Sequence, residues 1–287
     1  MRVRLLASLI CLCGCNRIFG LEDTALIADA DPCVLHAGDP GFHDEDGDGH
    51  DDACDNCPGI PNADQANALE AANGALVDQV GDACDPNPAL SGDTIALFDA
   101  FADSRVAERW DLVAGGWSFD GESLVYVKAP NLYAGTAIDL LPEPAPPFTA
   151  EFHLTLDVDL PNDIFSSATI LIDGVDDGTR TFHGVLCGVA RSGSPPNLTD
   201  NVHADSPGGG GETPYPYPLT SQTGHRVAAT YDPAAMVRCG VRPDANPSQR
   251  TEQRLTLATP PPPGHLGFAM SYKVDSHIHY VVIYGRE

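Results

Sequence analysis

Residues 44–58 read DEDGDGHDDACDNCP, and this stretch decides how the first part of the chain folds. Asp44, Asp46 and Asp48 alternate, a glycine follows, and further aspartates stand at the ninth and twelfth places counted from Asp44. Carboxylates at this spacing are typical of a calcium-binding loop, in which the backbone curls sharply so that they converge on one ion. The predicted metal ligands are the carboxylates of Asp44, Asp46, Asp48, Asp52 and Asp55 and the backbone carbonyl of His50.

The charge of the neighbouring sequence favours a bound cation over the alternative, a solvated acidic loop of the kind that Asp and Gly commonly form. No Lys or Arg occurs from Ile18 to Ser104, so the surrounding chain offers these carboxylates no permanent counter-charge. Gathering them without a cation costs several kcal/mol of repulsion or forces some of them to bind protons. We therefore expect calcium at this loop.

Two further motifs extend the pattern. DNCP at 55–58 and GDACD at 81–85, with Asn62 and Gln65 between them, make residues 32–88 similar to a thrombospondin type 3 repeat. The resemblance implies a chain that wraps around calcium ions, has little regular secondary structure and is stapled by disulfides. It also implies a second ion at Asp78, Asp82 and Asp85, although the largely apolar segment 67–77 interrupts the alternating aspartates that the family would have there.

The cysteines indicate an oxidising compartment, because an even set remains once those of the first fifteen residues are set aside. The six are Cys33, Cys54, Cys57, Cys84, Cys187 and Cys239. The type 3 resemblance implies the pairs Cys33–Cys54 and Cys57–Cys84, and with them a Cys187–Cys239 bridge in a second domain. A zinc site at Cys54 and Cys57 is the alternative, which the hard carboxylates around them disfavour.

The N-terminus predicts export and a lipid anchor. Residues 1–4 are basic, and the apolar run 5–12 is too short to span a bilayer, so 1–14 is typical of a signal peptide. LCGC at 12–15 resembles the lipobox of bacterial lipoproteins, which implies a lipid on Cys15, a membrane anchor there, and a tether over 15–31. Asn16, where inner-membrane lipoproteins commonly carry Asp, favours the outer membrane. An ordinary cleaved signal is the alternative.

From residue 93 onward the sequence changes to short runs rich in β-branched and aromatic residues, separated by Gly, Pro, Asp and Asn. The run 148–157 alternates apolar and polar residues, which is typical of a strand buried on one face. Many such runs over 93–287 predict a mainly β fold, an antiparallel β-sandwich of the jelly-roll kind. The calcium-wrapped, disulfide-stapled repeat of 32–88 would precede it.

The order of motifs in this second domain is similar to that of concanavalin A-like, or laminin-G-like, domains. The domain opens with LFDAF at 97–101 and continues with GWSFDGESL at 116–124. Near the end come GHLGF at 264–268 and a last apolar run at 280–285. The resemblance implies that the last strand returns beside the first.

The net charge of −26 disfavours a nucleic-acid partner. No Gly-x-Ser-x-Gly elbow, no His-Glu-x-x-His motif and no Glu-x-Asp-x-x-Glu run of the related glycoside hydrolases occurs, so we expect no enzyme. The sequence predicts a lipid-anchored envelope protein whose sandwich serves adhesion or binds a carbohydrate or an extracellular protein. A glycan-cleaving enzyme and a purely structural envelope protein remain alternatives.

The stretch PGGGGETPYPYP at 207–218 is the most unusual loop of the second domain. Its tyrosines, Tyr215 and Tyr217, have apolar rings with polar tips, which stack on sugars and on partner proteins. We predict them as ligand-binding residues. The alternative is a long mobile surface loop.

Overall fold

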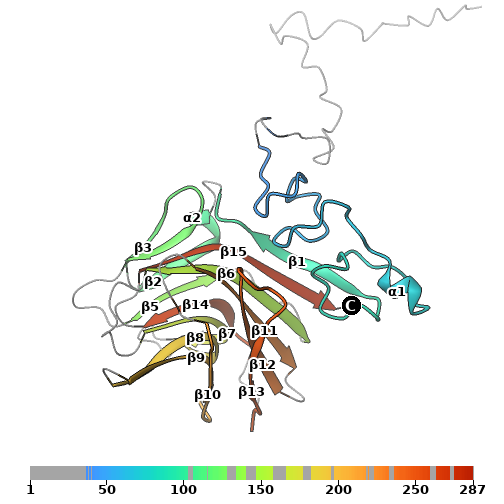
Figure 1. The fold of residues 1–287 in the computed structure, drawn as a ribbon. Coiled ribbons are helices and arrows are strands. Elements are labelled where there is room, and N and C mark those ends of the chain that lie inside the picture. The colour runs from blue at the N-terminus through green and yellow to red at the C-terminus, as the bar shows by residue number, and fades with distance from the viewer. Residues whose placement is uncertain are drawn as a thin grey trace, which may run out of the picture.

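The computed structural model shows two antiparallel sheets packed face to face, with an irregular N-terminal segment against one of them (Figure 1). The residues it describes are 37, 39, 41–102, 106–114, 116–127, 134–139, 147–157, 166–176, 182–194, 197–217, 219, 223–232, 236–258, 263–271 and 275–286. Cys15, Cys33 and the expected signal peptide and tether lie outside the described residues.

Sheet A has the strand order β13-β12-β11-β6-β15-β4-β3, and β1 pairs with β15. Its strands are β1 (Asp93–Asp99), β3 (Gly116–Phe119), β4 (Leu124–Val127), β6 (Phe148–Asp157), β11 (Gly224–Asp232), β12 (Met236–Pro243), β13 (Thr251–Leu255) and β15 (Asp275–Arg286).

Sheet B has the order β10-β9-β8-β7-β14-β5-β2. Its strands are β2 (Trp110–Ala114), β5 (Ala134–Asp139), β7 (Ser166–Asp176), β8 (Phe182–Ser194), β9 (Asn197–Asp205), β10 (Gly211–Pro214) and β14 (His265–Ser271). Two four-residue helices, α1 (Leu69–Ala72) and α2 (Val106–Arg109), complete the described elements. Neither is long enough to cross a membrane.

The main hydrophobic core lies between the two sheets, as the alternation of 148–157 predicts. On β6 the apolar residues Phe148, Phe152 and Leu154 are buried in this core, while the polar residues between them belong to the other face of sheet A. The disulfide Cys187–Cys239 joins β8 of sheet B to β12 of sheet A inside the core. The fold is therefore the predicted antiparallel β-sandwich.

Strand β15 organises sheet A because it pairs with three other strands. It pairs with β6 along its length, with β4 near its beginning and with β1 from Val281 to Arg286. The expectation that the last strand returns beside the first is thus confirmed. On the outer face of sheet A, Tyr280, Val282 and Tyr284 form a second hydrophobic cluster with Val80.

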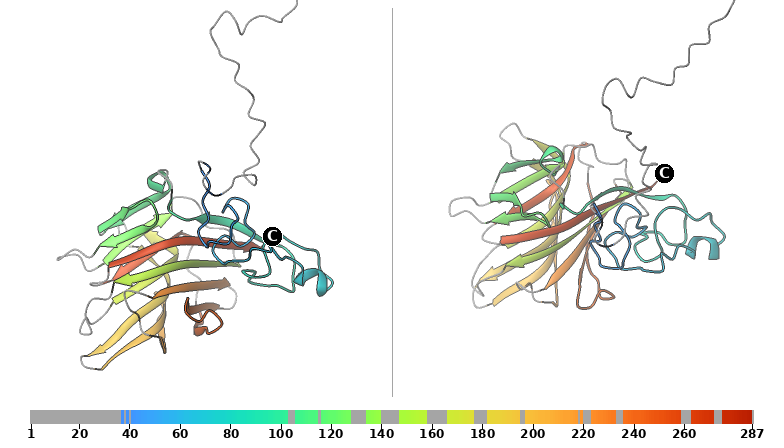
Figure 2. Two further views of the ribbon diagram at one scale, coloured as in Figure 1. Left: turned by 45° about the horizontal axis from the view of Figure 1, so that its top comes forward. Right: turned by 90° about the horizontal axis from the view of Figure 1, so that it is seen from above.

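That second cluster seats the N-terminal segment, residues 41–92, on sheet A. The segment runs beside β1 and the C-terminal end of β15 in each view (Figures 1 and 2). All of its residues are described, and they form one short helix and no strand, in keeping with the expected lack of regular structure. The disulfide Cys57–Cys84 and hydrogen bonds from backbone amides to carboxylates hold it together. They compensate for the small number of large apolar side chains buried there.

Candidate functional site

The predicted calcium loop folds so that its first three aspartates meet. One oxygen each of Asp44, Asp46 and Asp48 lies within 4.8 Å of the others. Gly47 and Gly49 have φ values of 77° and 99°, which a side chain would strain, so these glycines permit the curl. The Asp44 carboxylate accepts hydrogen bonds from the amides of both glycines, at 2.8 and 3.0 Å. The loop is therefore shaped around its own carboxylates.

The electrostatics of this cluster fit a hard cation. Asp46 Oδ2 is buried without a hydrogen-bond partner. Burial, and then the charges of Asp48, Asp55 and Asp44, raise the pKa of Asp46 to about 7. Asp55, only 6% exposed, has its pKa raised chiefly by burial, while Gln65 and the Cys57 amide stabilise its charge. An ion with oxygen ligands would relieve this repulsion without protons.

Two other predicted metal ligands, Asp52 and His50, are not among the three aspartates that meet. Asp52 turns to His43, whose Nδ1 lies 2.5 Å from Asp52 Oδ2, and also accepts a hydrogen bond from the Glu45 amide at 2.9 Å. The structure therefore does not bring Asp52 to the three gathered aspartates. His50 lies in the turn, where its amide donates to Asp48 Oδ1 at 2.9 Å. The histidine that competes for Asp52 was not part of the sequence prediction.

A second group of carboxylates forms where the type 3 pattern implies an ion, but with a different membership. Oxygens of Glu70, Asp78 and Asp85 lie within 4.8 Å of one another. Asp82 points instead to the start of α1, where it accepts the amides of Ala68 and Leu69 at 2.9 and 3.0 Å. The inserted segment 67–77 forms this helix, so it takes Asp82 away and brings Glu70 in.

Glu70 is the residue of this group that sequence reasoning missed. It is fully buried, and both of its carboxylate oxygens lack a hydrogen-bond partner. Burial, together with the neighbouring Glu70 and Asp93, raises the pKa of Asp85 to about 8. The one sequence signal was a glutamate inside an apolar insertion with no basic residue near it.

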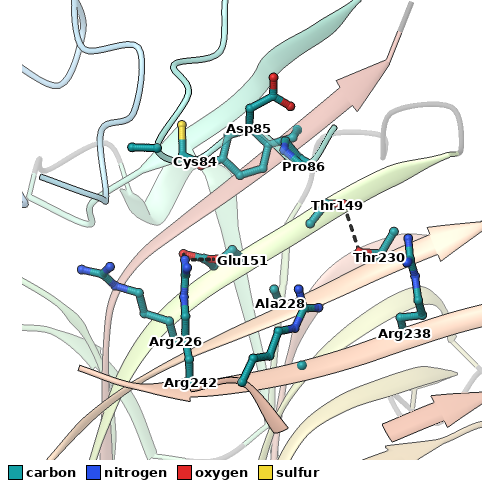
Figure 3. A pocket seen from close by; sticks show the side chains of 14 residues that line it. Cys84, Asp85, Pro86, Thr149, Glu151, Arg226, Ala228, Thr230, Arg238 and Arg242 are labelled. Atoms are coloured by element: carbon teal, nitrogen blue, oxygen red, sulfur yellow. Dashed lines mark hydrogen bonds and ion pairs between the residues drawn. The ribbon is translucent and has the colours of Figure 1, made fainter. Parts of the chain in front are cut away.

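A groove lies between residues 83–86 of the N-terminal segment and the outer face of sheet A (Figure 3). Its main part is a pocket of about 210 Å³. Cys84, Asp85 and Pro86 lie on one side, and side chains of β6, β11 and β12 lie on the other. A second cavity of about 200 Å³ continues it. The two cavities share the lining residues Pro86, Thr149, Thr230, Arg238 and Tyr284.

Arginines dominate the wall of this groove. The pocket is lined by Arg226, Arg238, Arg242 and Arg250, four of the 15 basic residues of the chain. Arg226 and Arg242 are direct cross-strand partners on β11 and β12, an arrangement of like charges that is unfavourable by itself. Arg250 lies across Gly240, where a Cβ atom would come within 1.9 Å of the Arg250 Nε.

Only one of these arginines has a close carboxylate partner in the pocket. Arg242 Nη2 lies 2.8 and 3.1 Å from the two oxygens of Glu151. Among the residues that the structure describes, Arg226 and Arg250 make longer ionic contacts, to Asp244 at 3.8 Å and to Glu252 at 3.9 Å. Sequence reasoning missed the groove because its arginines come from two strands and a loop.

The two tyrosines predicted to bind a ligand lie elsewhere. Tyr215 is 5% exposed, belongs to the main core, and has its hydroxyl 3.0 Å from Nδ1 of the buried His225. The prediction is wrong for Tyr215, because a ring inside the core cannot stack on a ligand. Tyr217 is half-buried beside it and donates to Gln249. Part of the predicted loop, Gly211–Pro214, forms the edge strand β10.

The cysteine predictions agree with the structure where it describes them. Cys57 pairs with Cys84, and Cys187 pairs with Cys239. Cys54 is also in a disulfide, and its expected partner Cys33 lies outside the described residues.

No protein-family model and no curated protein matches the chain. Among solved structures, it is similar to the exoplasmic/lumenal domain of VIP36 in a Ca²⁺/Man2-bound form, with 8% identity, a TM-score of 0.48 and coverage of 67% of this chain and 86% of that one. It is also similar to a lectin from Bauhinia forficata in complex with GalNAc, with 12% identity, a TM-score of 0.47 and coverage of 66% and 97%. A third similar structure is the laminarinase catalytic domain from Thermotoga maritima MSB8, with 12% identity, a TM-score of 0.48 and coverage of 69% and 100%. These likenesses concern the fold, an antiparallel β-sandwich, at identities too low to carry an activity from one chain to another.

Proposed function

We propose that this chain is an exported binding module whose groove takes an anionic ligand, and that the ligand is an acidic oligosaccharide. The observation that carries the proposal is the convergence of four arginines on one groove of a protein whose net charge is −26. Guanidinium groups bind carboxylates and sulfates through paired hydrogen bonds, which suits them to such a ligand.

The carboxylates of the groove do not neutralise all of its arginines, which leaves positive charge to bind an anionic ligand. The wall of the first pocket contains four arginines and two carboxylates, Glu151 and Asp85. The adjoining cavity adds Arg286, Asp93 and Asp232, so positive charge is in excess mainly in the first pocket. Arg226 Nε is buried without a hydrogen-bond partner, and Arg238 is exposed. An anion bound between the side chains of Arg226 and Arg242 would offset the repulsion between these cross-strand arginines.

The shape and remaining chemistry of the groove suit an oligosaccharide. The two adjoining cavities make the site longer than a pocket for a single small ion. The hydroxyls of Thr149 and Thr230, 3.3 Å apart, lie on the shared wall and can exchange hydrogen bonds with sugar hydroxyls. A sugar chain that carries carboxylate or sulfate groups combines both requirements.

Calcium has a structural role in this proposal. Asp44, Asp46 and Asp48, with Asp55 nearby, would hold the ion, and the ion would supply the positive charge that keeps the loop closed. The N-terminal segment forms one side of the groove, so a stable segment is a condition for binding.

We also propose that the module is displayed on a bacterial envelope, in the outer membrane, through a lipid on Cys15. The disulfides of the described residues support export, because such bridges persist in oxidising compartments. The lipid would hold the module near the membrane, and the tether of 15–31 would give it reach.

The binding test compares acidic with neutral oligosaccharides on the oxidised protein. We expect sulfated or uronate-bearing oligosaccharides to bind, neutral ones not to bind, and added salt to weaken binding. Arg238→Ala should lower affinity about tenfold or more, because a hydrogen bond to a charged group contributes about 1.5–3 kcal/mol. The matched control is Arg254→Ala, on the neighbouring strand β13 and outside both cavities. Equal binding of neutral oligosaccharides, or an unaffected Arg238→Ala variant, would contradict the proposal.

A glycan-cleaving enzyme is the second candidate, favoured by the two carboxylates Asp85 and Glu151 on the wall of one pocket. We place it second because Glu151 already accepts hydrogen bonds from Arg242 and Tyr280, which a proton transfer would have to break. Incubation with the bound oligosaccharide decides between the two. New reducing ends that disappear in Glu151→Gln would favour cleavage.

A further inference from the structure

We propose a second divalent-cation site, which takes calcium, where the N-terminal segment meets strand β1. Its ligands are the carboxylates of Glu70, Asp78 and Asp85, with Asp93 beside them. The site differs from the one that the type 3 resemblance implies, because Glu70 replaces Asp82. It does not depend on the ligand proposed for the groove.

The fully buried Glu70 is the strongest indication of this site. Its side chain has no exposed surface, and neither carboxylate oxygen has a hydrogen-bond partner. Burying an ionised carboxylate with no partner is too unfavourable to persist in a folded protein. One of its oxygens lies within 4.8 Å of oxygens of Asp78 and Asp85, so the side chain points toward other carboxylates. A cation between them resolves both problems.

Its neighbours are held in place by the backbone while keeping oxygens available. Asp85 Oδ1 accepts the Asn87 amide at 2.5 Å, and Asp85 Oδ2 is buried without a partner. Asp78 accepts the amides of Val80 and Asp93 at 2.9 and 2.8 Å, one on each oxygen. Each carboxylate oxygen has two acceptor sites, so these bonds leave room for a metal. Backbone amides therefore hold these carboxylates in position before a metal binds.

The donor set selects the type of ion. All of the side-chain ligands are carboxylates, and Cys57 and Cys84, the nearest cysteines in sequence, are joined in a disulfide and hold no thiolate. Oxygen-only ligands favour calcium or magnesium over zinc, and calcium accepts irregular geometry more readily. Arg286, the cross-strand partner of Asp93, is exposed and does not replace a cation at the buried Glu70.

The site lies where the N-terminal segment joins the sandwich, so the ion would connect the two. Glu70 lies on α1, Asp85 lines the groove, and Asp93 is the first residue of β1. Asp93 is 2% exposed and accepts two hydrogen bonds from Asn87 Nδ2, at 3.0 and 3.2 Å. An ion here would clamp the end of the N-terminal segment to the sandwich. An effect of the ion on ligand binding would follow only if the proposed function of the groove also holds.

The test counts calcium ions on the full, oxidised chain by titration calorimetry after removal of metal. Glu70→Gln should bind one ion fewer than the wild type. Asp82→Asn should bind as many as the wild type, because Asn still accepts the amides at the start of α1. An unchanged count in Glu70→Gln, or a loss of one ion in Asp82→Asn, would overturn the proposal.

A stability measurement separates a cation from shared protons, the other way to relieve these carboxylates. In chelator at pH 8, Glu70→Gln should melt at a higher temperature than the wild type, because it removes one buried charge. In calcium the order should reverse, because the variant gains less from the ion. A difference between the two proteins that calcium does not change would favour shared protons and overturn the site. Asp46 belongs to the other loop. Adding Glu70→Gln to an Asp46→Asn variant should therefore change the melting temperature in the same directions, with calcium and with chelator, as adding it to the wild type.

Discussion

The hydroxyl of Tyr280 lies 3.1 Å from the carbonyl oxygen of Gly59 and 3.1 Å from Oε1 of Glu151. Tyr280 and Gly59 are 221 residues apart, so this contact joins the last strand to the N-terminal segment. Glu151 in turn holds Arg242 in the groove. The seating of the segment and the charge of the groove therefore share one buried network.

Removing the Tyr280 hydroxyl should weaken this network. In Tyr280→Phe the ring still packs against Phe98, but the Gly59 carbonyl and Glu151 lose the single hydroxyl proton that they share. We expect the free energy of unfolding to fall by about 1–3 kcal/mol in urea denaturation, the usual effect of leaving buried polar groups unpaired. Tyr217→Phe, which removes a half-buried hydroxyl bonded to Gln249, is the control and should change stability by less. Equal effects of the two substitutions would contradict the role of Tyr280.

Gly59 should not tolerate a side chain. A Cβ atom there would lie 2.5 Å from Cζ of Tyr280, whose ring is 1% exposed and cannot move aside. Gly59→Ala should therefore lower stability by about 1–3 kcal/mol through overpacking, measured as a lower melting temperature. Gly208→Ala is the matched control, because its Cβ would meet nothing closer than 3.8 Å. A Gly59→Ala variant as stable as this control would show that the segment does not sit on Tyr280.

Substitutions in the calcium loop test which aspartates bind the ion: all of those predicted from the spacing in the sequence, or only those that the structure brings together. Asp46→Asn should abolish most of the rise in melting temperature that calcium produces from this loop, because Asp46 belongs to the gathered aspartates. Asp52→Asn should leave that rise largely intact, because Asp52 is engaged with His43 and the Glu45 amide. Scanning calorimetry at pH 8 with calcium and with chelator measures both. Loss of the calcium response in Asp52→Asn would favour the ligand set read from the sequence.

Buried His225 should make the protein less stable as the pH falls. Its ring nitrogens lie 3.0 Å from the hydroxyls of Tyr215 and Thr223, and burial lowers its pKa from 6.5 to about 4. Between these two values the unfolded chain binds a proton that the folded protein does not, so stability is lost on going from pH 6.5 to 4. One such group contributes at most about 1.4 kcal/mol per pH unit.

Denaturant titrations of the wild type and His225→Gln across this range measure the effect. Glutamine keeps a donor and an acceptor beside the two hydroxyls but does not titrate. The stability advantage of the wild type over the variant should shrink as the pH falls. A pH-independent difference would mean that His225 titrates alike in the folded and unfolded chains.

Local patterns in the sequence were sufficient for much of the fold. The alternation at 148–157 predicts which face of β6 enters the core, because side chains of a strand alternate whatever the rest of the chain does. The spacing of Asp44, Asp46 and Asp48 likewise predicts their convergence, since a short loop with permissive glycines closes on itself. These features depend on residues near one another in sequence.

The partner that an individual side chain contacts could not be predicted in this way, even where that partner lies within ten residues. Asp52 turns to a histidine outside the spacing motif, and Tyr215, placed in a surface loop by its neighbours, enters the core against His225. Neither motif nor composition states which of two partners a side chain will contact. That choice follows from packing.

The sequence by itself therefore determined a β-sandwich preceded by an acidic, cysteine-rich segment, because periodicity and ligand spacing act over short stretches. Only the tertiary structure decided where the chemistry gathers. Arg226 and Arg242 meet because β11 pairs with β12 in one register, and Glu70 joins Asp78 and Asp85 because the inserted helix folds back onto them. Register and docking are set by the summed packing of the whole chain, so the groove and the buried carboxylates exist only in the folded protein.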